Sequence, residues 1–321
     1  MTRTSTVDLA GAQMGGAARF GAELHRYLAR TGRNDVRVIG ASRKLDPGWL
    51  MRRELAAPNR SRRIALNNVG FLAPGGERWT LLRNALHFLT ADEASCLDSS
   101  LHAATGREAT VVRLTARRAD VLVVPCTAMA DRVASVLPSV SGRIVVRPHP
   151  VSADAVPRLP RDSAILCPVL FAPYKHMTQR LAELLAALQD YPDPSVRLRV
   201  TADRNDVAGH VAADPRVDFA GRLDQHDLRQ LWARSRAIYF PSGLESFGYP
   251  LAEARASGQP VIARDTAQNR EIAGPALCGF LPGNRVSLRD AIERALTTEV
   301  TPDPDAFNPD AYFSWLLGSS Q

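Results

Sequence analysis

Short apolar runs alternate with longer amphipathic stretches along this chain. Residues 120–125 and 237–240 are nearly unbroken apolar segments with β-branched or aromatic side chains, a pattern typical of strands buried in a parallel sheet. Residues 20–32 and 179–188 instead place apolar side chains at helical spacing. The alternation predicts an α/β fold made of βαβ units, with doubly wound, Rossmann-like sheets.

The strand–helix alternation runs through the first half of the chain and starts again after residue 162, so we expect two domains, in keeping with a length of 321 residues. Residues 151–162 contain prolines and no regular period, which indicates a linker. Two such domains would face each other across a cleft at the carboxyl ends of their sheets. The predicted organisation is a first domain at 1–152, a second at 153–308, and a tail at 309–321 that packs back on the first.

The most informative stretch is a strand–loop–helix–strand unit at residues 237–263. Pro250 suits the first turn of a helix, where its missing N–H costs nothing. Gly258 suits the left-handed position that ends a helix. The loop therefore leads into a helix N-terminus, and the N–H groups of residues 247–249 would favour an anion such as phosphate.

Two carboxylates flank this predicted anion site. Glu245 lies in the loop and Glu253 in the first turn of the helix, with seven residues between them. A carboxylate beside a phosphate is unfavourable unless it accepts hydrogen bonds, for instance from sugar hydroxyls. The pair therefore suits a nucleotide-sugar. The alternative is that Glu253 only complements the helix dipole and Glu245 is solvated.

Residues 241–262 follow the pattern Pro-Ser-x-x-Glu-Ser-Phe-Gly-x-x-x-x-Glu-Ala-x-Ala-x-Gly-x-Pro-Val-Ile. This pattern resembles the signature of the GT4 family of retaining glycosyltransferases. The resemblance implies the GT-B architecture and transfer of a sugar from a nucleotide-diphosphate sugar to a hydroxyl acceptor, such as a small natural product, a sugar or a lipid-linked sugar. Retention in this family is assigned to front-face attack with the departing phosphate as base, so neither a metal nor a cofactor is expected.

The same resemblance assigns roles to individual residues. It implies that Glu253 accepts the ribose hydroxyls, that Glu245 accepts hydroxyls of the donor sugar, and that the backbone near Phe247 holds phosphate. The implied donor-binding residues are Gly15, Gly16, Arg222, Ser246, Phe247, Gly248 and Glu253, and the implied catalytic residues are Glu245, Lys175 and His87.

Lys175 is the expected phosphate-binding cation. It is one of only two lysines among 40 basic residues, and it matches the phosphate-binding lysine of the family; a solvated loop end is the alternative. The partner arginine that the family carries five residues earlier is Leu170 here. We expect Arg222 or Arg204 to supply the missing charge.

In the first domain, residues 11–20 form a glycine-rich segment with Gly15 and Gly16 at its centre. It resembles the family's loop against the donor; a turn that only packs the helix is the alternative. His87 follows the strand predicted at 79–82, where the family often contacts the donor sugar, although a lone histidine is more often structural. His149 stands between two prolines where the family commonly has Asn-Gly, which leaves its role open.

The formal net charge is +7, which could favour nucleic acid, an anionic membrane or phosphorylated substrates. Aromatic residues make up only 6%, and no basic tract is interleaved with them, which argues against nucleic acid. Residues 43–62 gather arginines around Trp49. We expect a mobile or acceptor-facing segment there, with a weak membrane-surface contact as the alternative.

The four cysteines are scattered without metal-ligand spacing, which favours small core residues in a reducing cytoplasm. The N-terminus lacks a secretory segment, so we expect a cytoplasmic enzyme. Residues 313–315 (Phe-Ser-Trp) resemble the start of the family's closing helices, but only six residues follow, so this helix should be short or absent. The alternatives to an enzyme of this type are a non-catalytic GT-B-like nucleotide-sugar-binding protein and a nucleotide-sugar epimerase.

Overall fold

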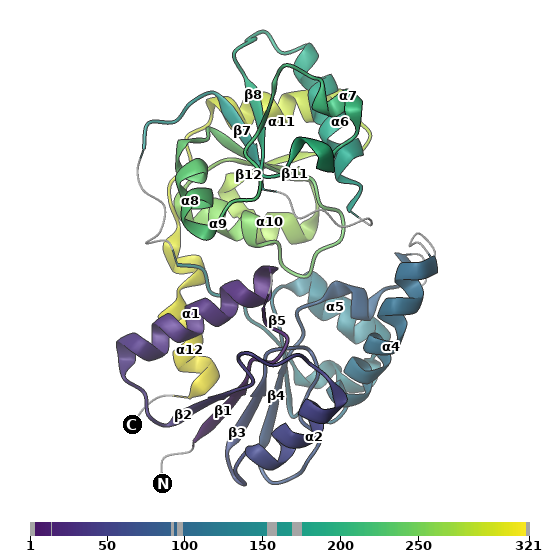
Figure 1. Cartoon of the computed structure of the whole chain (residues 1–321), viewed down its shortest axis with the longest axis vertical. Helices are drawn as coiled ribbons and strands as arrows, with labels where there is room; N and C mark the ends of the chain where they lie inside the picture. Colours follow the sequence, from purple (N-terminus) through teal and green to yellow (C-terminus); the bar gives the residue numbers. More distant parts are fainter. Residues whose placement is uncertain are drawn as a thin grey trace. The chain divides into compact units, whose positions relative to one another are not determined.

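The computed structural model describes residues 4–13, 15–90, 93–94, 99–152, 159–168 and 175–318, with only the backbone for 99–104. The chain divides into two compact units (Figure 1). Unit 1 comprises Met1–Val151, Glu245–Phe247 and Phe307–Gln321, and unit 2 comprises Ser152–Leu244 and Gly248–Ala306. The first and last segments of the chain therefore both belong to unit 1.

Unit 1 is built on a parallel sheet with the strand order β2-β1-β3-β4-β5-β6. Strand β1 pairs with β2 on one side and with β3 on the other, so the winding reverses at β1. Open α/β sheets bind ligands at the carboxyl ends of strands around such a switch point. The strands are β1 (Ser5–Asp8), β2 (Val36–Ile39), β3 (Arg62–Ala65), β4 (Glu77–Leu81), β5 (Val121–Val124) and β6 (Ile144–Val146).

Unit 2 contains a second parallel sheet, with the order β12-β11-β10-β7-β8-β9. Its switch point lies where β10 pairs with β7, which places the end of β10 at the ligand-binding edge. The two sheets confirm the predicted doubly wound α/β class. The strands are β7 (Ala164–Cys167), β8 (Arg197–Val200), β9 (Val217–Phe219), β10 (Ala237–Phe240), β11 (Val261–Arg264) and β12 (Leu277–Phe280).

An aromatic cluster joins the two ends of the chain in the core of unit 1. The Phe20 ring lies edge-on to Phe313, with centroids 5.4 Å apart, and the Ser5 hydroxyl donates to the Leu317 carbonyl at 3.0 Å. Helix α12, yellow in Figure 1, thus lies beside the purple helix α1. The helices and 3-10 turns of unit 1 are α1 (Gly15–Thr31), α2 (Pro47–Ala56), η1 (Ala85–Phe88), α4 (Ser99–Ala116), α5 (Thr127–Val136), η2 (Pro138–Arg143) and α12 (Pro309–Leu317).

The core of unit 2 lies between its sheet and helices α6 and α11. Leu181, Leu198 and Ile292 are fully buried in it. None of the helices formed by the described residues is long and apolar enough to cross a membrane. The remaining helices and turns are α6 (Met177–Gln189), η4 (Arg204–Asp206), α7 (Gly209–Ala212), α8 (Gln225–Arg234), α9 (Tyr249–Ser257), α10 (Ala267–Ala273), η5 (Gly274–Ala276), α11 (Arg285–Thr297) and η6 (Pro304–Phe307).

Residues 43–62, where we expected a mobile or acceptor-facing segment, contain helix α2; contact with an acceptor or a membrane surface stays a prediction. The Asp46 side chain caps this helix by accepting a hydrogen bond from the Trp49 N–H at 2.8 Å. Arg53 lies on its inner face, and its side chain is 1% exposed. Arg63, on the neighbouring strand β3, is also buried and donates to the Ala73 carbonyl at 2.9 Å. Sequence reasoning placed these cations at the surface because it could not see the acceptors that compensate them.

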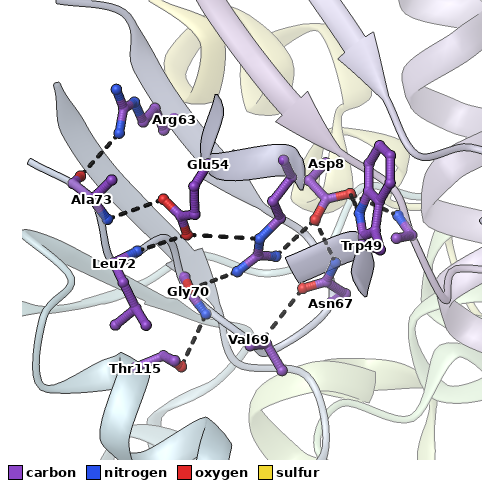
Figure 2. Close-up of polar contacts among 12 residues, drawn as sticks. Asp8, Trp49, Glu54, Arg63, Asn67, Val69, Gly70, Leu72, Ala73 and Thr115 are labelled. Atoms are coloured by element: carbon purple, nitrogen blue, oxygen red, sulfur yellow. Dashed lines mark hydrogen bonds and ion pairs between the residues drawn. The ribbon is translucent and has the colours of Figure 1, made fainter. Parts of the chain in front are cut away.

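The main acceptor is Asp8, the last residue of β1 (Figure 2). Its Oδ2 accepts hydrogen bonds from Arg53 Nη1 at 2.7 Å and from Asn67 Nδ2 at 2.9 Å. Its Oδ1 accepts from Trp49 Nε1 at 3.1 Å and from the Ala10 N–H at 3.0 Å. With four donors around one fully buried carboxylate, the charge of Arg53 is compensated inside the core.

Candidate functional site

The loop after β10 ends in a left-handed glycine that begins helix α9. Gly248 has a φ of 86° and is the N-cap residue, and Pro250 lies in the first turn. A Cβ at Gly248 would lie 2.9 Å from Leu251 Cδ1 and 3.2 Å from Phe240 Cε1. Both the backbone conformation and the space therefore require glycine here. Glycine supplies no side-chain cap, and the helix dipole favours an anion at this end.

Glu253 is the fifth residue of α9. The sequence predicted that Glu253 lies in the first turn. Because the helix begins at Tyr249, Glu253 instead lies in the second turn. Its side chain is half-buried, whereas those of Ala252 and Ala254 beside it are buried. The carboxylate thus stands on the partly open side of the helix, one turn from its N-terminus.

Residues Glu245–Phe247 belong to unit 1. The Ser246 hydroxyl donates to the Arg83 carbonyl at 2.6 Å, and the Ser246 carbonyl accepts from Cys126 Sγ at 3.3 Å. Phe247 is buried, with its ring edge-on to His149 at a centroid distance of 5.1 Å. Glu245 itself is half-buried. The loop that carries the predicted donor contacts is therefore anchored by side-chain and backbone hydrogen bonds.

Arg83 is the residue that sequence reasoning missed in unit 1. It follows strand β4, and its guanidinium lies 4.5 Å from the centroid of the Phe20 ring. Arg83 Nη2 donates to the Gly16 carbonyl at 2.7 Å, and Nε donates to His149 Nε2 at 3.3 Å. One side chain therefore ties the start of α1 to the segment after β6. The sequence did contain one indication of its role, because Arg83 directly follows the strand predicted at 79–82 and so lies where open α/β sheets bind ligands.

The surroundings of His149 favour the neutral form of its imidazole. Its ring is buried and lies edge-on to Phe20, with centroids 5.4 Å apart. Burial, and secondarily the positive charge of Arg83, hold the pKa of His149 well below its ordinary value. A neutral imidazole can accept the hydrogen bond that Arg83 donates, so electrostatics and hydrogen bonding agree.

Gly15 and Gly16 are the first two residues of α1, so the expectation that both lie in a loop is wrong. Gly15 has a φ of 57°, and a Cβ there would meet no described atom within 4 Å. The start of α1 is therefore open beside Gly15. The Gly16 carbonyl is taken by Arg83, as described above.

His87 is fully buried in the turn η1. Its Nε2 lies 3.2 Å from Glu108 Oε1 and 3.3 Å from Asn84 Nδ2. The hydrogen bond with His87 lowers the pKa of Glu108. The imidazole thus links η1 to α4, and its contact with a donor sugar stays a prediction.

Lys175 lies directly before helix α6, and its side chain is half-buried. His176 follows with a φ of 48° and is the N-cap residue of α6, so the chain turns sharply at this point. Leu170, where the family carries an arginine, lies outside the described residues.

Arg222 and Arg204 were expected to compensate for Leu170. Arg222 is exposed and follows Gly221, whose φ is 68°. Arg204 lies over the Phe219 ring, with its guanidinium carbon 5.2 Å from the centroid. Arg204 is also exposed, and phosphate binding by either arginine stays a prediction.

Residues 204–312, about a third of the chain, match the model of the family described as glycosyl transferases group 1. The matched segment contains helix α9 and both members of the Glu245–Glu253 pair. The chain resembles the group 1 glycosyltransferases. This finding confirms the resemblance that residues 241–262 carry.

Solved glycosyltransferases share the fold over nearly the whole chain. WaaG, a glycosyltransferase involved in lipopolysaccharide biosynthesis, is 14% identical with a TM-score of 0.67, covering 98% of this chain and 100% of WaaG. Sucrose-phosphate synthase from Thermosynechococcus elongatus is 15% identical with a TM-score of 0.64, covering 99% of this chain and 95% of the synthase. These likenesses confirm the GT-B fold.

Two curated relatives from Escherichia coli match over a short segment. O-antigen chain mannosyltransferase B is 33% identical over 60 residues, which are 19% of this chain and 16% of the relative. The serotype-specific mannosyltransferase WbdA is 39% identical over 64 residues, which are 20% of this chain and 8% of the relative. The match thus spans less than a fifth of the length of either relative.

Proposed function

We propose that the chain is a retaining glycosyltransferase that moves a sugar from a nucleotide-diphosphate sugar to a hydroxyl acceptor without a metal ion. The observation that carries this proposal is the junction at Gly248, where a helix N-terminus begins between Glu245 and Glu253 along the chain. The GT-B fold and the family match over residues 204–312 support it.

The chemistry follows from where charge develops. Departure of the nucleoside diphosphate leaves an oxocarbenium-like sugar and builds negative charge on the leaving phosphate. The N-terminus of α9 and the ammonium of Lys175 stabilise that charge. Glu253 accepts hydrogen bonds from the ribose and Glu245 from the donor sugar, which holds both parts in position. The departing phosphate then takes the proton of the acceptor hydroxyl, as the resemblance implies.

In unit 1 we assign Arg83 a positioning role. Its guanidinium holds the Gly16 carbonyl and the imidazole of His149, and its own carbonyl accepts from Ser246. Three segments at the carboxyl ends of the sheet are thereby held in one arrangement before a substrate binds, which lowers the cost of ordering them.

The relatives guide the choice of donor, and the family resemblance guides the choice of acceptor. Both curated relatives are named mannosyltransferases, so GDP-mannose comes first among the donors we propose to test, followed by UDP-, dTDP- and ADP-sugars. The acceptor is a sugar, a lipid-linked sugar or a small natural product. We place the enzyme in the cytoplasm, since the buried cysteines Cys126, Cys167 and Cys278 form no disulfide and suit a reducing compartment.

A thermal-shift screen of the wild-type protein against these donors tests the proposal, because a ligand that binds the folded state raises the melting temperature. We expect Glu253→Gln to weaken binding of the active donor about 10- to 100-fold and Lys175→Ala to lower turnover more than donor affinity. Glu293→Gln, on the exposed face of α11, is the matched control. No stabilisation by any nucleotide-sugar would refute the proposal, whereas binding without transfer would favour the non-catalytic alternative.

A further inference from the structure

Arg264 ends a buried strand at the ligand-binding edge of unit 2. It is the last residue of β11, after three fully buried residues, Val261–Ala263. The strand pairs with β10 through Ala263 and Phe240. The Arg264 side chain therefore leaves the sheet at its carboxyl end, beside the loop that leads from β10 to α9.

That loop is shaped to receive the guanidinium of Arg264. A Cβ built on Gly243 would lie 2.3 Å from Arg264 Nη1 and 2.8 Å from its Cζ. The guanidinium thus lies directly against the Gly243 backbone, at a distance that any larger residue would prevent. Gly243 itself is exposed, so the guanidinium lies close to solvent.

The charge of Arg264 is poorly compensated by the described part of the chain. Its Nε is buried and has no hydrogen-bond partner there, which is also true of Arg53 and Arg180. Unlike those two arginines, Arg264 forms no ion pair with a described carboxylate. The nearby Arg180 does have a carboxylate partner, Glu183, at 2.9 Å. Burial, and secondarily the charge of Arg180, lower the pKa of Arg264, and the negative charge of Glu183 opposes this shift only in part. A half-buried guanidinium beside a second cation is an unfavourable arrangement that an anion would relieve.

We propose that Arg264 binds the diphosphate of the donor and supplies the cation that is missing at Leu170. A guanidinium presents a planar fork of N–H donors that matches phosphate oxygens. The position is right for that role, because it lies at the carboxyl end of the strand next to β10, whose own loop leads into the N-terminus of α9. The inference rests on the proposed function and assigns the cation to a residue that no motif marks.

Isothermal titration of the full chain with inorganic pyrophosphate and with UDP, GDP, dTDP and ADP tests this assignment. Arg264→Gln should weaken the binding of pyrophosphate and of the preferred nucleoside diphosphate about 10- to 100-fold. The matched control is Arg270→Gln, whose side chain is 62% exposed and paired with Asp265, and it should leave both affinities unchanged. The melting temperature of ligand-free Arg264→Gln should stay the same or rise, because the variant loses a poorly compensated charge. A purely structural arginine would give a lower melting temperature.

Gly243→Ala provides a second test that keeps the charge. The new methyl group displaces the flexible end of Arg264 and should weaken pyrophosphate binding in the same direction, by about 10-fold. Joint loss of affinity in Gly243→Ala and Arg264→Gln supports the assignment.

The outcomes separate this inference from the proposed function. If the wild type binds nucleoside diphosphates and Arg264→Gln binds them equally well, the assignment of Arg264 is wrong and the proposed function stands. If pyrophosphate binds in an Arg264-dependent way but no nucleotide-sugar binds, the anion site stands and the proposed function is wrong. Failure of the wild type to bind any of these anions overturns both.

Discussion

Arg53 in unit 1 and Arg264 in unit 2 are two arginines near the carboxyl ends of parallel strands with opposite surroundings. Arg53 is 1% exposed and bonds to the fully buried Asp8 at 2.7 Å. Arg264 is half-buried and forms no ion pair with a described carboxylate, although the Nε of both arginines lacks a hydrogen-bond partner among the described residues. Burial alone therefore does not tell what an arginine does.

The difference lies in whether the protein itself supplies the counter-charge. Around Asp8 every buried charge has a partner within the chain, so the cluster stabilises the arrangement of β1 and α2 and has little capacity left for a ligand. At Arg264 no described carboxylate forms an ion pair and only the charge of Glu183 acts from a distance, so an incoming anion would gain the direct pairing that the protein does not supply. Mutation of the Asp8–Arg53 cluster should therefore lower the stability of the protein, whereas mutation of Arg264 should weaken the binding of an anion.

The largest effect should come from Asp8→Ala, which leaves the buried Arg53 without its carboxylate. We expect a loss of about 3–5 kcal/mol in the free energy of unfolding, measured by urea denaturation. The control is Asp120→Ala, because Asp120 is 43% exposed and paired with Arg78, and it should cost less than about 1 kcal/mol. Similar losses in the two variants would contradict the contrast between compensated core charges and surface pairs.

Arg83 is an intermediate case, since it bonds to a carbonyl and to a neutral ring. We expect Arg83→Met to cost about 1–3 kcal/mol of stability and to lower turnover more than donor affinity. Arg83→Lys should restore only part of the lost stability and of the lost turnover, because an ammonium cannot hold Gly16 and His149 with one planar group. Arg26→Met, which changes a half-exposed arginine on α1, is the control. A full rescue by lysine would show that charge matters at this position and geometry does not.

A smaller, pH-dependent effect is expected from His149, whose pKa in the folded state is held well below its ordinary value. Below about pH 6.5 the unfolded chain binds a proton that the folded protein does not, so stability should fall as the pH falls, by up to about 1.4 kcal/mol per pH unit. Above about pH 7 the group contributes nothing to the slope. Urea denaturation of wild type and His149→Gln between about pH 5.5 and 7.5 measures the difference. Parallel curves would show that folding does not shift the pKa of His149, which would contradict this prediction.

The sequence predicted the fold class because apolar strands and amphipathic helices leave clear periodic patterns. It also predicted that a helix would begin near Pro250, since proline and glycine mark the two ends of α9. It did not predict that α1 begins at Gly15, because glycine suits a loop and a helix start equally well. The partners of Arg83 and the isolation of Arg264 could not be predicted, since both depend on which distant side chains the fold brings together.

The position of α12 in unit 1 has a consequence for biosynthesis. Phe313 and Leu316 are fully buried beside residues of β1 and α1. The Ser5–Leu317 hydrogen bond likewise joins α12 to β1, so segments from opposite ends of the sequence pack together. During translation, the apolar surface that α12 covers must stay exposed until α12 leaves the ribosome, when all of unit 2 has already been synthesised. Unit 1 should therefore mature after unit 2 and should be the unit that more needs chaperone protection.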